Sequence, residues 1–104
     1  EGKKYSQSST KYERSMKNRA ACIAYHGATC KACDMSFSDK YGNTGFGFIH
    51  IHHLYPLSEG DKSKPVNPIK DLVPVCPNCH SMLHRGEKLL TIEELKEIIR
   101  LNEN

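Results

Sequence analysis

Two closely spaced cysteine pairs bracket a double histidine in this sequence. The residues are, in chain order, Cys30, Cys33, His52, His53, Cys76 and Cys79. Four thiolates arranged in two C-x-x-C pairs suit a closed tetrahedral zinc site. Because a closed site keeps no coordination position for a substrate, the histidines are free to carry out other chemistry.

The histidines could gather around a second metal. In an extended strand His50 and His52 point to one side and His53 points to the other, so neighbouring histidines can have different roles. One of the pair 52–53 could join His80 and His84, which share one face of a helix, around a divalent metal. The other could act as a general base on a water beside a phosphate. This set predicts metal-assisted hydrolysis of a phosphodiester.

The remaining histidines and the fifth cysteine have simpler interpretations. We expect His26 to be a surface residue at a helix end, where an imidazolium is favoured. For His50 two interpretations stay open, packing or support of a metal ligand. Cys22 should be a small buried side chain on a helix. Two disulfides are the alternative to zinc, but C-x-x-C spacing beside histidines favours metal, and an odd thiol fits a reducing compartment.

Length and charge fit one small domain that contacts nucleic acid. The chain has 104 residues, of which 38% are hydrophobic and none is Trp, so a metal-stabilised core is expected. Its formal net charge is +3, and residues 1–29 hold six basic side chains against two acidic ones. A charge excess this small is by itself more often a solvated face, but it can attract phosphates where the chemistry already points to nucleic acid. We expect sequence-independent DNA contacts from Arg14, Lys17, Arg19 and Arg85.

The sequence contains neither a membrane-span pattern nor a signal-peptide pattern, so we expect a cytoplasmic protein of a bacterium or phage. The chain begins at Glu1 rather than Met. This beginning predicts a part of a longer protein, with a domain that reads the DNA target attached upstream. A homodimer is compatible with the same features.

Periodicity and capping signals predict the elements that position these residues. Residues 1–10 are polar and aperiodic and predict a flexible lead-in to a single domain over 11–104. Ser9 or Thr10 would cap a helix that ends near His26. The other predicted elements are a loop over 34–47, a strand over 47–54, a long connection over 55–70, a short edge strand over 72–75, a helix from Pro77 and a last helix from the capping box at Thr91.

The order of these motifs resembles a known family. C-x-x-C, then H-H-L-Y-P-L, then D-L-V-P-V-C-P-N-C-H is similar to the HNH endonucleases, most of all to their zinc-stabilised branch in modification-dependent restriction enzymes. The resemblance covers about residues 27–85. It implies an α+β fold, a ββα-metal finger held by the four-cysteine zinc site, with helices on both sides. It also implies DNA as the substrate.

The resemblance assigns roles by position. It makes His53 the general base and makes His52 and His80 ligands of a catalytic divalent metal, Mg²⁺ or Mn²⁺, with Zn²⁺ or Ni²⁺ as alternatives. His84 matches a further ligand of the branch that includes the colicin nucleases. The family's central asparagine braces the loop that holds the base, and Asp71 stands at its position here. Aspartate accepts the same hydrogen bonds but cannot donate one.

Two other functions remain open from the sequence. The chain could be a non-catalytic zinc-stabilised module that binds DNA or protein, although such a module would not require His52, His53 and His80. It could also be a homing enzyme or a phage-encoded nickase. Asn67 and Asn78 fit the asparagine position less well than Asp71.

Overall fold

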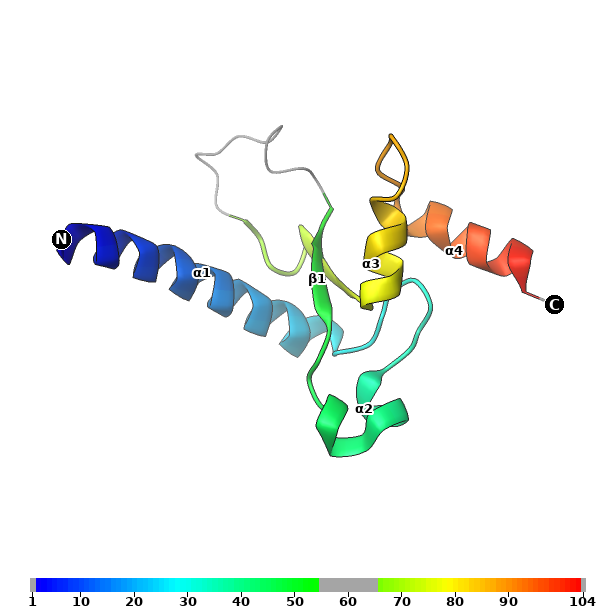
Figure 1. Cartoon of the computed structure of the whole chain (residues 1–104), viewed down its shortest axis with the longest axis horizontal. Helices are drawn as coiled ribbons and strands as arrows, with labels where there is room; N and C mark the ends of the chain where they lie inside the picture. The colour runs from blue at the N-terminus through cyan, green and yellow to red at the C-terminus, as the bar shows by residue number, and fades with distance from the viewer. Residues whose placement is uncertain (1, 55–65, 104) are drawn as a thin grey trace.

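The computed structural model describes residues 2–54 and 66–103 and has the expected α+β architecture (Figure 1). An antiparallel pair of strands, β1 (His50–His53) and β2 (Leu72–Val75), lies between the helices. The two terminal helices extend to opposite ends of the molecule (Figure 1). The helices are, in chain order, α1 (Gly2–His26), α2 (Phe37–Tyr41), the short 3-10 helix η1 (Gly42–Gly45), α3 (Pro77–Leu83) and α4 (Ile92–Asn102).

The two strands pair in an antiparallel register. His52 is paired with Val73, and His53 is paired with Leu72. Pro74 is tolerated in β2 because this strand pairs on one side only. On its other side the Pro74 carbonyl accepts a hydrogen bond of 3.0 Å from the Lys31 backbone N–H. The loop of the first cysteine pair is thereby joined to β2.

The hydrophobic core is built around the cysteines. Val75 and Leu83 are fully buried in it, and Leu95 brings in α4. Partly buried side chains, among them Phe37 and Leu90, pack against this cluster. The core therefore joins α3, α4 and β2 around the four sulfur atoms of Cys30, Cys33, Cys76 and Cys79.

Helix α1 begins earlier than predicted. It starts at Gly2 and runs to His26, so residues 2–10 are helical and neither Ser9 nor Thr10 is a cap. These residues contain no proline, and the one glycine stands at the helix start, so nothing in them stops a helix that already exists further along. The predicted end is confirmed, because Gly27 follows with a φ of 83°. Among the α1 residues whose burial is described, Cys22 is buried, as expected.

Residues 34–47 are not simply a loop, and that prediction was wrong. They contain α2 and η1, which pack against each other. The rings of Phe37 and Tyr41 stack four residues apart with centroids 5.9 Å apart. A side chain at Gly45 would clash with the Phe37 backbone, so a glycine is required for this approach. Tertiary contact of Phe37 with the core, which local composition does not reveal, supports the helix.

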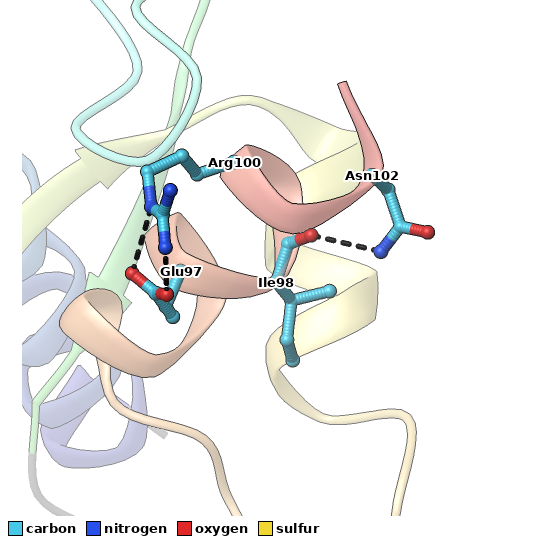
Figure 2. Close-up of polar contacts among 4 residues, drawn as sticks. All are labelled: Glu97, Ile98, Arg100 and Asn102. Atoms are coloured by element: carbon cyan, nitrogen blue, oxygen red, sulfur yellow. Dashed lines mark hydrogen bonds and ion pairs between the residues drawn. The ribbon is translucent and has the colours of Figure 1, made fainter. Parts of the chain in front are cut away.

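The predicted capping box of α4 is confirmed. The Thr91 hydroxyl accepts from the Glu94 N–H at 3.0 Å, and the Glu94 carboxylate accepts from the Thr91 N–H at 2.8 Å. On the exposed side of α4 Arg100 donates to Glu97, and the Asn102 side chain donates to the Ile98 carbonyl (Figure 2). Exposed pairs of this kind contribute little to stability.

Two further points complete the fold. Of the predicted connection over 55–70, residues 55–65 lie outside the described residues. Among the helices in the described part of the chain, none is both long and apolar enough to cross a membrane.

Candidate functional site

The two cysteine pairs converge, although more than forty residues of chain separate them. The first pair lies in a tight turn that follows α1, where the Cys30 N–H donates to the Met35 carbonyl at 3.0 Å. The second pair begins α3, with Cys76 at the N-cap position and Pro77 as the first helical residue. The four cysteine sulfur atoms all lie within 4.8 Å of one another. All four are free thiols.

Backbone N–H groups surround the cysteine sulfurs. The N–H groups of Ala32 and Cys33 each lie 3.4 Å from the Cys30 sulfur, and the Cys79 N–H lies 3.4 Å from the Cys76 sulfur. Although burial opposes ionisation of Cys30, backbone hydrogen bonds outweigh it and hold the pKa of this thiol below its usual value. Burial raises the pKa of the Cys33 thiol to about 11 and also raises that of Cys79. The thiolate form that zinc binds is therefore favoured by backbone donors at Cys30 and opposed by burial at the other two. The group is consistent with structural zinc.

A second group is formed by histidines from β1 and α3. His52 comes from the strand, His80 from the middle of the helix and His84 from its C-cap. One ring nitrogen from each lies within 4.8 Å of the others. The ring centroids are 5.1–5.4 Å apart. Helix α3 contacts β1, and α3 itself starts at the second cysteine pair (Figure 1).

The chemistry of these histidines fits a divalent metal. His52 is 2% exposed, and its Nδ1 has no hydrogen-bond partner among the described residues. A buried nitrogen without a partner is costly unless something else binds it. Burial, and to a smaller extent the nearby charges of His80, His84 and His53, together lower the pKa of His52 to about 4. Burial also lowers the pKa of His80. Both rings are therefore neutral near pH 7, the form that binds metal.

His53 has a different environment from its neighbour. It follows His52 in β1, and because side chains alternate it points to the opposite side and is exposed. Its charge contributes to the lowered pKa of both His52 and His80, so it lies close enough to interact with them electrostatically. An exposed imidazole beside a metal site can reach a water and a substrate.

Asp71 contacts backbone rather than histidine. Its carboxylate accepts from the Asn67 N–H at 2.8 Å, and its carbonyl accepts from the Leu54 N–H at 2.9 Å, directly after the double histidine. The Asn67 side chain in turn accepts from the N–H groups of Ile69 and Lys70 at 2.9 and 3.0 Å. Bracing of this turn is thus shared between Asp71, which the sequence favoured for this position, and Asn67, which it considered a less good fit.

His50 is the other residue that the structure brings to the site. Its Nδ1 lies 3.1 Å from the Nδ1 of His80. Alternation along β1 placed it on the same side as His52, but sequence alone did not distinguish packing from support. His26 is elsewhere, with its Nε2 2.9 Å from the Ile69 carbonyl.

The basic residues that were expected to contact DNA lie on α1 and in the segment just after α3. Lys17 and Arg19 are on α1, and Arg85 directly follows the site residue His84. Lys17 and Arg85 are exposed, and Arg19 is half-buried. The side chain of Arg14 lies outside the described part. Arg85 is therefore the basic residue nearest in sequence to the histidine group.

Comparison with known proteins places this geometry in a family. The family model described as HNH endonuclease matches residues 30–86, more than half of the chain. The type IV methyl-directed restriction enzyme EcoKMcrA of Escherichia coli K12 is 30% identical over 93 residues, which are 89% of this chain and 31% of that protein. Anaredoxin of Nostoc is 39% identical over 41 residues, 39% of this chain and 49% of that protein.

The chain thus spans about a third of the length of the restriction enzyme and about half of the length of anaredoxin. No solved structure matches the chain. The match over residues 30–86 contains both cysteine pairs, the double histidine and the histidines of α3. The chain belongs to the HNH endonuclease family.

Proposed function

We propose that this chain is a metal-dependent endonuclease domain that hydrolyses DNA phosphodiester bonds, as part of a restriction-type enzyme. The observation that carries the proposal is the group of His52, His80 and His84, with ring nitrogens within 4.8 Å of one another beside the exposed His53. A non-catalytic binding module would need the cysteine site for its stability. It would not require three converging histidines next to the exposed imidazole of His53.

In the proposed mechanism His52, His80 and His84 would hold a divalent cation, Mg²⁺ or Mn²⁺, with Zn²⁺ or Ni²⁺ as alternatives. When bound there, the cation stabilises negative charge on the phosphate and on the leaving oxygen. His53 in its neutral form accepts a proton from the attacking water. The water oxygen forms a bond to phosphorus, the bond to the 3′-oxygen breaks, and solvent protonates that oxygen. The products are a 5′-phosphate and a 3′-hydroxyl.

The surrounding elements support these roles. Thiolates of both cysteine pairs would hold a structural zinc, which fixes the start of α3 and hence the position of His80. The hydrogen bond from Leu54 to Asp71 keeps the hairpin paired directly after His53. Lys17, Arg19 and Arg85 would hold flanking phosphates without reading bases. Recognition of a target or of a modified base belongs, in this proposal, to a further domain of the longer protein.

A plasmid assay tests the proposal. Supercoiled DNA is incubated with the zinc-loaded protein in the presence and in the absence of added Mg²⁺ or Mn²⁺, and the product ends are analysed. We expect nicked or linear DNA with 5′-phosphate ends, only when divalent metal is present. A matched control is His26→Ala, which removes a histidine outside the site and should cut like the wild type. If the wild-type protein binds DNA but cuts none with any divalent metal, it is a binding module instead.

A further inference from the structure

We propose that His50 is a positioning residue that fixes the orientation and the protonated nitrogen of His80, so that the Nε2 of His80 is presented to the catalytic metal. This inference rests on the proposed function of the three-histidine group. His50 is not one of the three histidines whose nitrogens converge.

The contact itself is specific. His50 and His52 are two residues apart in β1 and therefore lie on the same side of the strand. The Nδ1 atoms of His50 and His80 are 3.1 Å apart, and the ring planes are nearly perpendicular at 88°. At this distance one nitrogen must donate a proton and the other must accept it. Two bare lone pairs facing each other would repel.

Only one direction of this hydrogen bond suits metal binding. A neutral imidazole carries one proton, so a proton on Nδ1 leaves the Nε2 lone pair free. If His80 donates through Nδ1 to His50, its Nε2 can bind a metal. In the reverse arrangement His80 would carry the proton on Nε2 and could not use that nitrogen as a ligand. Metal-binding histidines generally have their second nitrogen held by such a partner.

His50 is held in place by aromatic packing. The Phe48 ring lies edge-on to the His50 ring, with the two ring centroids 6.0 Å apart. The Phe48 ring also packs edge-on with the Phe37 ring, and these ring centroids are 4.9 Å apart. Phe37 belongs to α2 and packs on the core. A row of rings therefore connects α2 to His80 through His50. Helix α2 contributes no side chain to the histidine group. Through this row of rings it nevertheless supports the position of His50.

Two substitutions separate the hydrogen bond from packing. His50→Phe keeps a ring but removes the acceptor, whereas His50→Asn can place its side-chain oxygen where Nδ1 stands and accept from His80. We expect Mn²⁺ affinity, measured by calorimetry on the zinc-loaded protein, to fall about ten- to a hundredfold in His50→Phe. His50→Asn should stay within a few-fold of the wild type. His26→Phe, outside the site, should bind Mn²⁺ unchanged.

Nitrogen-15 NMR of the Mn²⁺-free protein shows directly whether Nδ1 or Nε2 of His80 carries the proton. We expect His80 to carry its proton on Nδ1 in the wild type and in His50→Asn, and to populate the Nε2-protonated form in His50→Phe. Pulsed EPR of bound Mn²⁺ should detect the same number of coordinated imidazoles in the wild type and in His50→Phe. One imidazole fewer in His50→Phe would make His50 a ligand and overturn the proposal, as would an unchanged affinity in that variant.

Cleavage is measured separately, so that the two proposals can fail independently. A wild type that binds Mn²⁺ but cuts no DNA refutes the nuclease function and leaves the role of His50 to the binding and NMR results. In an active protein, His50→Phe should need more metal for half-maximal cleavage and approach the wild-type rate at saturation. Thermal unfolding and zinc content of each variant confirm that it is folded.

Discussion

The adjacent histidines of β1 differ in environment because of strand geometry alone. His52 is 2% exposed and its pKa is lowered to about 4, whereas His53 is on the exposed side. A buried neutral imidazole suits a metal ligand, and an exposed one suits proton transfer with water. In the proposed mechanism, a metal ligand and a general base therefore stand at adjacent positions of the same strand.

Replacing the proposed base tests this separation. His53→Ala should keep zinc, fold and DNA binding while cleavage falls by about a hundredfold or more, the effect expected for loss of a general base. Raising Mg²⁺ or Mn²⁺ should not restore the rate, because a metal ion cannot replace a positioned proton acceptor. The measurement is single-turnover cleavage at several metal concentrations. Cleavage at the wild-type rate would remove His53 from the mechanism.

Replacing a proposed ligand should behave differently. His80→Ala should also lose cleavage, but through weaker metal binding, so that raised Mg²⁺ or Mn²⁺ restores part of the rate. Calorimetric titration of Mn²⁺ should show the lower affinity directly. Rescue of His80→Ala together with no rescue of His53→Ala distinguishes ligand from base. Equal behaviour of the two variants would contradict the assignment.

The lowered pKa of His52 predicts a pH dependence of stability. The ordinary pKa of a histidine is 6.5, as expected in the unfolded chain, and the pKa of His52 in the folded protein is about 4. Between these values the unfolded state binds more protons, so the free energy of unfolding should decrease as pH falls from about 6.5 towards 4. Urea unfolding without added divalent metal measures this slope. His52→Leu should flatten it, whereas His26→Leu should not.

At the scale of elements, what the sequence could predict depended on local signals. β2 was predicted at its observed bounds, α3 was predicted from Pro77, and α4 from the capping box at Thr91. These signals act within a few residues. Helix α2 was missed because it depends on contacts of Phe37 with the core, and the early start of α1 was missed because residues 2–10 carry no helix signal of their own.

The same distinction applies to the candidate site. Spacing alone placed His80 and His84 on one helix face and His50 and His52 on one strand face. It did not show that the two faces meet, nor that His50 lies 3.1 Å from His80, because this needs the docking of α3 on β1. The catalytic roles of these residues stay predictions until the variants above are measured.

The capping box offers a test at the element scale. Thr91→Ala removes the acceptor for the Glu94 N–H and should destabilise the fold by about 1 kcal/mol. For a domain of this size the midpoint of thermal unfolding should fall by about 4–8 °C. Thr44→Ala, an exposed threonine of η1, is the matched control and should change it little. DNA cleavage should be unaffected by either change. An unshifted midpoint for Thr91→Ala would mean that α4 is stabilised by packing alone.

At the scale of the whole molecule, stability and site geometry depend on the same four sulfurs. The core residues surround Cys30, Cys76 and Cys79, which come from both halves of the chain. A domain of 104 residues without Trp has little apolar core to replace them. If the four cysteines bind zinc as proposed, loss of that ion should therefore release α3 from the hairpin and separate the histidines.

Zinc removal tests this dependence. The purified protein should contain about one tightly bound zinc, and chelation should unfold it because the binding free energy is also folding free energy. Circular dichroism during chelation, together with metal analysis, measures both. Cys76→Ser should fold poorly, whereas Cys22→Ser, a buried thiol outside the zinc group, should retain zinc. A folded, zinc-free protein would contradict the prediction.

Charge is distributed unevenly along the molecule, which determines where DNA should bind. Residues 1–29 hold six basic and two acidic side chains, whereas residues 86–104 hold three basic and five acidic ones. If Lys17, Arg19 and Arg85 contact phosphates, the slope of log affinity against log salt should be about −2.7, from about −0.9 for each contact. Binding should depend little on the DNA sequence, because contacts to phosphates do not distinguish between bases.

Single substitutions then locate the DNA surface. Arg85→Ala should weaken binding to all sequences and make the salt slope less steep by about 1. Arg100→Ala is the matched control, because Arg100 lies on α4 and is paired with Glu97 at the acidic end of the chain (Figure 2). Fluorescence anisotropy at several salt concentrations gives both slopes. Should Arg100→Ala reduce the slope while Arg85→Ala leaves it unchanged, DNA would bind along α4, away from the histidines, and the phosphate contacts proposed beside His84 would be wrong.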